Sequence, residues 1–234
     1  MRVLRGRAAT IEADHDRTDA MVERVVETGE PALRVWTPHR QIAFGRRDAN
    51  AAGYDRARQI ARDRDYTPVE RRVGGRAVAF TGTTLAAVYA DPDVDRTAIH
   101  SRYETAIERY RRALDSLGVD AREGEPEQSF CPGSHSLQAD CGGRSRKILG
   151  LAQRVRSEVA VVAGVLAVDD HGQIAAVLDP VYDALGVAFD PETVGSVAAA
   201  GGESDPDAVV AAVEAALVDG ESVTVERAAE AVES

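Results

Sequence analysis

The chain contains little cysteine and no long apolar run. Cys131 and Cys141 are the only cysteines among its 234 residues, which is too few for a disulfide framework. No apolar run approaches the roughly 20 residues that a membrane-spanning helix requires. Residues 1–7 are basic, but no apolar stretch of the kind found in a signal peptide follows them. We therefore expect a cytoplasmic protein with no membrane partner.

Lysine is almost absent as well. Of the 28 lysine and arginine residues, only Lys147 is lysine, and the formal net charge is −11. An acidic surface that is poor in lysine keeps a protein hydrated at high salt, so we expect a halophilic source. A GC-rich genome, which favours arginine, alanine and glycine codons, is the alternative explanation. The acidic balance argues against nucleic acid as a partner, because phosphate binding requires a basic face.

The single lysine is the first candidate functional residue. Lysine carries a compact ammonium on a flexible stem, whereas arginine carries a wide planar fork. Lys147 follows a glycine-containing basic turn and precedes an apolar stretch that we expect to be a buried strand. From that position an ammonium can hold an anionic oxygen and stabilise the charge that develops during acyl or phosphoryl transfer. The alternative is that one lysine has simply escaped replacement.

The hydrophobic pattern mixes helices and strands. Apolar residues at helical spacing predict the helices, and short alternating or continuous apolar runs predict the strands. The expected helices cover residues 18–28, 49–64, 95–117, 180–185 and a C-terminal segment that starts at 204–207. The expected strands cover residues 32–36, 41–45, 84–89, 158–168 and 173–178, with 67–69 extended and 169–172 forming a hairpin turn. This order predicts an α+β fold with mixed, mostly antiparallel sheets and packed helices.

We expect two parts in the chain. Residues 1–190 carry the strands and helices of one domain, which we take to be catalytic. Within residues 191–234, a linker-like run rich in alanine and glycine at 198–203 precedes a good helix start. We therefore predict a linker and a short helical C-terminal tail over 191–234.

A pair of glycines between arginines forms the second candidate segment. Gly74 and Gly75 lie between Arg71 and Arg72 on one side and Arg76 on the other. Adjacent glycines let a ligand approach the main chain closely, and arginines can neutralise a carboxylate or phosphate. The spacing fits neither a Walker loop nor a dinucleotide-binding loop. A tight turn with a solvated basic rim is the alternative reading.

The third candidate is a loop cysteine. Cys131 is followed by Pro132 and Gly133, and a nearby cation would make its thiol a nucleophile. Inert packing is the alternative, since most loop cysteines have no chemical role. The two cysteines lack a Cys-x-x-Cys companion, and the five histidines show no ligand spacing, so we expect no metal site formed by these residues.

Three segments occur in an order that resembles the lipoate–protein ligase A family, within the wider group of biotin and lipoate ligases and octanoyltransferases. Residues 36–46, from Trp36 to Arg46, are similar to the family's first strand pair. Residues 71–78 are similar to its Arg-Arg-x-x-Gly-Gly motif, although one residue short. Residues 147–154 are similar to its Lys-Ile-x-Gly-x-Ala-Gln motif. The resemblance covers about residues 10–190.

The resemblance implies an ATP-dependent ligase with the biotin/lipoate ligase fold. Such an enzyme uses ATP, Mg²⁺ and lipoate to form lipoyl-adenylate and transfers the lipoyl group to a lysine of an apo lipoyl domain, either of a 2-oxoacid dehydrogenase E2 or of glycine-cleavage H protein. Lys147 would contact the acyl carbonyl. The matching positions imply substrate and nucleotide contacts from Arg71, Arg72, Gly74, Gly75, Arg76, Ala77, Gly150, Ala152 and Gln153. The short C-terminal region also fits members whose accessory domain is a separate chain.

Two alternatives stay open beside the ligase. Octanoyltransferases of the same fold take the acyl group from acyl carrier protein onto a cysteine without ATP, and Cys131 lies 16 residues before Lys147, much as in one branch of them. A binding protein that keeps the fold and has lost the chemistry is the other alternative. Departures from the family pattern at Phe80-Thr81, His135-Ser136 and Ala163-Gly164 put the nucleotide contacts in doubt.

Overall fold

The computed structural model describes residues 1–71 and 74–228 and contains two sheets and six α-helices within them. The strands are β1 Arg2–Arg5, β2 Ala32–Trp36, β3 Gln41–Phe44, β4 Thr67–Glu70, β5 Val78–Phe80, β6 Leu85–Asp91, β7 Ala121–Glu123, β8 Ser136–Asp140, β9 Ser145–Val155, β10 Ala160–Leu166 and β11 Thr224–Arg227. The helices are α1 Ile11–Thr28, α2 Arg46–Ala49, α3 Tyr54–Arg62, α4 Ile99–Ser116, α5 His171–Ala184 and α6 Pro206–Val218.

The two sheets have different sizes and partners. The larger has eight strands in the order β11-β1-β2-β6-β10-β9-β8-β7, and the smaller has the order β4-β3-β5. In the large sheet, β1 pairs in parallel with both β2 and β11, whereas the successive pairs along β2-β6-β10-β9-β8-β7 are antiparallel. This confirms the expected α+β class with mixed, mostly antiparallel sheets.

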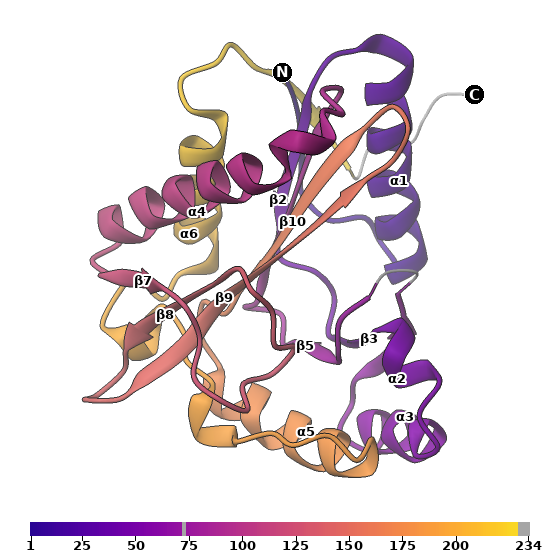
Figure 1. The fold of residues 1–234 in the computed structure, drawn as a ribbon, viewed down its shortest axis with the longest axis vertical. Coiled ribbons are helices and arrows are strands. Elements are labelled where there is room, and N and C mark those ends of the chain that lie inside the picture. Colours follow the sequence, from indigo (N-terminus) through magenta and orange to yellow (C-terminus); the bar gives the residue numbers. More distant parts are fainter. Residues whose placement is uncertain (72–73, 229–234) are drawn as a thin grey trace.

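The elements form layers that Figure 1 shows side by side. Helices α4 and α6 cover one face of the large sheet, where the largest apolar cluster includes Leu33, Leu85, Leu114 and Val213. Helix α1 and the small sheet lie on the opposite face. Helices α3 and α5 cover the far side of the small sheet.

The face of β10 toward the small sheet is only partly covered. Val162, Gly164 and Leu166 are buried against the helices, while Val161, Ala163 and Val165, which alternate with them, are half-buried. A strand places successive side chains on opposite faces, so this row of small apolar residues borders the space between the sheets. The site described below lies at the edge of that space.

Several expected elements are confirmed. The strand at 32–36 has the expected bounds, and the strands at 41–45, 84–89 and 158–168 are shifted by at most two residues at either end. The long helix also forms, ending at Ser116. The first helix starts earlier than expected, because Thr10 accepts a hydrogen bond from the N–H of Ala13 and caps it. The helix expected over 49–64 is divided into α2 and α3.

The strand expected over 173–178 is wrong, because these residues belong to helix α5. Its buried residues Ile174, Val177, Leu178 and Val181 recur at helical spacing, and a short apolar run does not by itself distinguish the two structures. The hairpin turn expected over 169–172 is also wrong, since Asp170 precedes the first turn of this helix.

The C-terminal region packs on the large sheet. Val209, Val213 and Leu217 of α6 lie in the same apolar cluster as the strands, and β11 pairs with β1 along residues 224–227. The helix start at 204–207 is confirmed, whereas strand β11 was not expected. The proposed division of the chain at residue 190 stays a prediction.

Candidate functional site

The paired glycines pass directly beside the end of strand β3. A Cβ atom on Gly45 would overlap with the carbonyl oxygen of Gly75, so the two backbones touch. Gly75 also has a φ of +93°, which side chains other than hydrogen rarely tolerate. Glycine is therefore required at both positions, and the turn itself forms a wall of the site.

Two of the arginines around this turn, Arg71 and Arg76, bind other groups of the protein. Arg71 donates from Nη2 to the carbonyl oxygen of Arg76 at 2.6 Å, and its buried Nε has no partner among the described residues. Arg76 donates to Asp48 Oδ1 at 3.2 Å. The fully buried Asp48 also accepts from the N–H of Gly45 at 3.0 Å, so one carboxylate ties both glycine segments together. Arg72 lies outside the described residues.

Cys131 lies against the glycine turn. Its Sγ accepts from the N–H of Arg76 at 3.4 Å and would lie 3.0 Å from a Cβ on Gly75. The N–H of Cys131 donates to Tyr182 Oη at 2.6 Å, and Tyr182 donates to the carbonyl oxygen of Ala77 at 3.0 Å. Burial, together with the nearby Cys131, raises the pKa of Tyr182, so its hydroxyl stays protonated and keeps this bridge.

Lys147 lies in the wall of the same site, on strand β9. It is only 1% exposed, and Nζ donates to Glu125 Oε2 at 2.6 Å and to the carbonyl oxygens of Phe130 and Cys131 at 3.0 Å each. Glu125 also accepts from Ser136 Oγ at 2.8 Å. Burial works to raise the pKa of Glu125, but the hydrogen bond and charge of Lys147 outweigh it and hold that pKa below its usual value.

The rest of the Lys147 segment divides between two faces of β9. Gly150 lies beside the lysine, since a Cβ there would be 3.7 Å from Nζ. Ala152 follows on the same face and is exposed. Gln153 pairs with Val162 and points to the opposite face, where its amide nitrogen and oxygen are buried and find no partner in the described part of the chain. The structure therefore brings Gly150 to Lys147 and turns Gln153 away.

Cys131 and Lys147 meet through the loop that joins β7 and β8. The loop carries the thiol, and two of its carbonyls bind the ammonium. Cys131 has a φ of +40°, an uncommon backbone geometry for cysteine that costs about 1–2 kcal/mol. Within the described residues, no hydrogen bond joins Nζ to Sγ. A thiol that accepts a backbone N–H, on a residue whose own carbonyl binds a buried cation, is suited to nucleophilic acyl transfer.

Sequence reasoning missed three residues of this site. Glu125, Tyr182 and Asp48 hold the lysine, the cysteine loop and the glycine turn, respectively. Glu125 lies in an irregular segment and had no local signal. Tyr182 lies in the helix expected over 180–185, which the structure extends into α5, but no sequence pattern indicates that its hydroxyl reaches the Cys131 loop. Asp48 follows the glycine that ends β3, and that spacing was its only clue.

Other clusters of polar residues do not extend the site. Within residues 1–71 and 74–228, no group of three histidine, cysteine or acidic side chains is close enough to hold a metal ion. His135 stacks on Tyr103 at a ring distance of 3.6 Å. Cys141 is buried, and burial raises the pKa of its thiol. None of the helices described is both long and apolar enough to cross a membrane.

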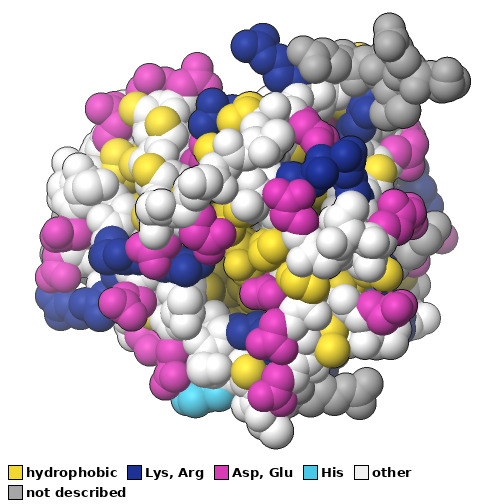
Figure 2. All heavy atoms as spheres, turned by 90° about the horizontal axis from the view of Figure 1, so that it is seen from above, with side chains coloured by type: hydrophobic (Ala, Val, Ile, Leu, Met, Phe, Trp, Pro, Cys, Tyr) yellow, Lys and Arg dark blue, Asp and Glu magenta, His cyan; other side chains and the backbone are white. Residues whose placement is uncertain are grey.

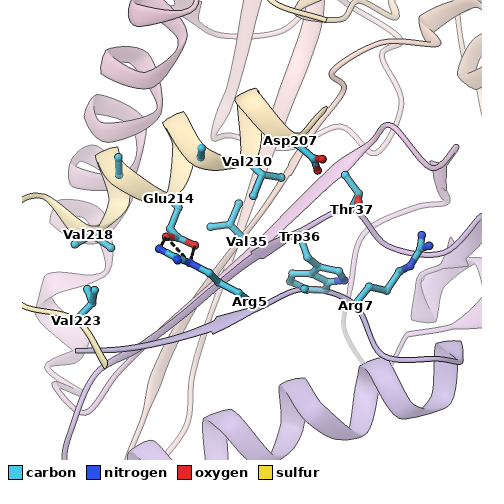
Figure 3. Close-up of a pocket in the computed structure, with 13 residues that line it drawn as sticks. Arg5, Arg7, Val35, Trp36, Thr37, Asp207, Val210, Glu214, Val218 and Val223 are labelled. Atoms are coloured by element: carbon cyan, nitrogen blue, oxygen red, sulfur yellow. Dashed lines mark hydrogen bonds and ion pairs between the residues drawn. The ribbon is translucent and has the colours of Figure 1, made fainter. Parts of the chain in front are cut away.

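Two cavities lie away from Cys131 and Lys147. One of about 620 Å³ lies between α6 and strands β1 and β2, and the ion pair of Arg5 with Glu214 closes one side of it (Figure 3). Another of about 230 Å³ lies between α4 and strands β6 and β10. Figure 2 shows one face of the molecule with a hollow that has apolar side chains at its centre and interspersed basic and acidic side chains around it.

Comparison with known proteins identifies curated relatives of one activity. The chain is 31% identical over 160 residues to the octanoyl-[GcvH]:protein N-octanoyltransferase of Kyrpidia tusciae, covering 68% of this chain and 54% of that protein. It is 32% identical over 134 residues to the protein of the same name from Geobacillus kaustophilus, covering 56% and 46%. The chain spans about half the length of the curated relatives it matches.

Solved structures share the fold at lower identity. Lipoate-protein ligase A bound with ATP superimposes with a TM-score of 0.74 at 20% identity, covering 97% of this chain and 87% of that one. Protein Ta0514 of T. acidophilum with bound lipoic acid gives 0.70 at 20% identity with the same coverage. Residues 13–218 match the family model described as the lipoyl protein ligase A/B catalytic domain. The chain therefore belongs to the lipoyl protein ligase A/B catalytic domain family, whose members are enzymes.

Proposed function

We propose that this chain is a cysteine-dependent octanoyltransferase that moves an octanoyl group between lysines of lipoyl-domain proteins. The position of the Cys131 thiol carries the proposal. The thiol faces the glycine turn and accepts a backbone N–H, and the loop that carries it also supplies two carbonyl oxygens to Lys147. The names of the curated relatives, which give octanoyl-GcvH as donor, support it. The ligase expected from sequence becomes the second candidate.

The first half-reaction transfers the octanoyl group to the enzyme. Cys131 Sγ, as thiolate, attacks the carbonyl carbon of the octanoyl amide on a donor lysine. The carbonyl oxygen becomes an oxyanion, which the ammonium of Lys147 stabilises. Collapse of this intermediate breaks the bond to nitrogen, the donor amine takes up the proton that the thiol gave, and a thioester remains on Cys131.

The second half-reaction reverses the first with a new amine. The ε-amine of an acceptor lysine attacks the thioester carbonyl, the carbon–sulfur bond breaks, and the amine proton returns to the thiol. One lysine amide is exchanged for another, so the overall reaction needs no ATP. An octanoyl thioester of acyl carrier protein would enter the first half-reaction in the same way, with a thiol as leaving group.

A ligase is the second candidate because one arginine beside the glycine turn has an unsatisfied donor. The buried Nε of Arg71 has no partner among the described residues, which leaves a donor for an anionic group such as a phosphate. Of the other cations of the predicted site that the structure describes, Arg76 binds Asp48 and Lys147 binds three oxygens. ATP, Mg²⁺ and lipoate remain predictions for this chain.

The acceptor class follows from the family. We propose apo lipoyl domains, of GcvH or of a dehydrogenase E2, as the proteins whose lysines exchange the acyl group. An accessory chain, a cytoplasmic location and a halophilic source remain predictions from sequence.

Intact-protein mass spectrometry tests the transferase. The chain is incubated at high salt with octanoyl-GcvH, with octanoyl-acyl carrier protein, or with lipoate and Mg-ATP, each with an apo lipoyl domain. We expect an octanoyl adduct on the enzyme that hydroxylamine removes, and an acylated acceptor in the absence of ATP. Cys131→Ser should abolish both, and the matched control Cys141→Ser should retain both. A lipoyl acceptor formed only with ATP, and unaffected by Cys131→Ser, would establish the ligase instead.

A further inference from the structure

Lys147 has no hydrogen free for a substrate in this structure. An ammonium has three N–H donors, and those of Lys147 point to Glu125 Oε2, Phe130 O and Cys131 O. The side chain is 1% exposed, so water does not supply a further partner. An acyl carbonyl can therefore bind Nζ only by displacing one of these three oxygens.

The carboxylate is the partner hardest to displace. Its bond to Nζ is the shortest of the three and joins opposite charges of which one is fully buried, so releasing it would leave a buried unpaired ammonium. The carbonyls of Phe130 and Cys131 are neutral. They also belong to a loop whose backbone is held in uncommon geometry, with φ of +58° at Gln128 and +40° at Cys131.

Glu125 also connects the lysine to the rest of the loop. Its Oε1 accepts from the N–H of Gly133 at 2.9 Å, two residues beyond the thiol, and its Oε2 accepts from Ser136 Oγ at 2.8 Å in strand β8. One carboxylate, which precedes Cys131 in the chain, thus accepts from three donors that follow it. Only an ionised carboxylate can do so, because a carboxamide presents one oxygen and a nitrogen that would face an N–H.

We propose that Glu125 is a positioning residue for acyl transfer, which holds Lys147 and the Cys131 loop in one cage while the acyl carbonyl displaces a backbone carbonyl from Nζ. The proposal rests on the proposed function, since it assigns the role of Lys147 in the same site. Glu125 keeps the ammonium in place through the exchange. When a loop carbonyl leaves Nζ, the strained backbone at Cys131 relaxes.

Thiol alkylation tests whether Glu125 holds the Cys131 loop in place, and it does so independently of acyl transfer. Cys131 and Cys141 are alkylated with iodoacetamide in the full chain, and each rate is measured by peptide mass spectrometry. We expect Glu125→Gln to raise the Cys131 rate by ~10-fold or more, the scale of losing a charge-assisted hydrogen bond, and to leave the buried Cys141 unchanged. Glu127→Gln is the matched control, because it removes the same charge from an exposed position two residues away. Equal Cys131 rates in the two variants would overturn the proposal, as would faster alkylation of both cysteines.

Kinetics and amide exchange test the role in transfer. We expect Glu125→Gln to lower the single-turnover rate of Cys131 acylation by ~10-fold or more with little change in KM for the octanoyl donor, and Glu125→Asp to recover part of it. By NMR, the Gly133 amide of the unchanged protein should stay protected from exchange after acylation, because the carboxylate does not leave. Loss of that protection, or an unchanged acylation rate in Glu125→Gln, would overturn the proposal. If the unchanged protein transfers no octanoyl group, the proposed function fails, while the alkylation rates still report on the cage.

Discussion

Replacing Lys147 with arginine tests whether the site needs a compact ammonium. Nζ reaches three oxygens at 2.6, 3.0 and 3.0 Å from a single point, and Lys147 is only 1% exposed. A planar guanidinium cannot direct its donors to the same three positions. Lys147→Arg keeps the charge opposite Glu125 but loses the contact to the developing oxyanion. We expect a loss of at least ~2 kcal/mol of transition-state stabilisation, or roughly 30-fold in acylation rate.

Two measurements separate chemistry from folding in this variant. Single-turnover acylation of Cys131 reports the barrier, and thermal unfolding reports stability. Arg144→Lys is the control, because Arg144 pairs with Glu192 on the surface, where both side chains are more than half exposed, and the substitution exchanges the same two residue types. The reasoning is refuted if Lys147→Arg acylates as fast as the unchanged protein. A slower rate at an unchanged unfolding temperature would support it.

Three further substitutions follow from the packing. Gly75→Ala should slow iodoacetamide alkylation of the site thiol and abolish acyl transfer, because its Cβ would lie 3.0 Å from Sγ at a φ of +93°; normal transfer would contradict this. Tyr182→Phe should lower the free energy of unfolding by about 1–3 kcal/mol, measured by urea denaturation, since a buried N–H and C=O both lose their partner. Arg34→Met should cost about 3–5 kcal/mol by the same assay, because the buried Asp14 loses its ion pair.

The lowered pKa of Glu125 gives stability a defined pH dependence. Its carboxylate is favoured in the folded state by Lys147, so it stabilises the fold above the ordinary glutamate pKa, and this contribution is lost as the pH falls through the lowered folded value. The difference in unfolding temperature between the unchanged protein and Glu125→Gln should therefore narrow on acidification. A difference that stays constant from neutral to acidic pH would contradict this assignment.

Elements with strong local signals could be predicted from the sequence. The strand over 32–36 and the long helix ending near residue 117 have clear apolar periodicity, and both formed as expected. Residues 173–178 misled the prediction because their apolar run is equally compatible with a strand, and only the packing of α5 under the small sheet decides between them. Strand β11 depends on pairing with β1, more than 200 residues earlier in the chain, which no local pattern reports.

The motifs of the candidate site could be predicted from the sequence, but the side-chain hydrogen bonds that join them could not. The glycine pair, Cys131 and Lys147 were found by residue type, and the structure brings them together. The side chains that hold them, Glu125 and Tyr182, come from an irregular loop and from a helix. Their roles arise from hydrogen bonds formed in the folded chain: Glu125 is 22 residues from Lys147, and Tyr182 is 51 residues from Cys131.

The position of the only lysine strengthens the case that its chemistry is required. If lysine is scarce because a lysine-poor surface stays hydrated at high salt, that selection acts only on exposed residues. Lys147 is buried and lies outside it. Burial alone does not explain the exception, because Arg34 is equally buried and is an arginine. Arg34 binds Asp14, Gly6 and Thr18 through two separate nitrogens, an arrangement that suits a fork. Lys147 instead gathers three oxygens around one atom, which only an ammonium does. The two interior cations thus differ in the geometry of their acceptors, and the acceptors of Lys147 include the loop that carries the thiol.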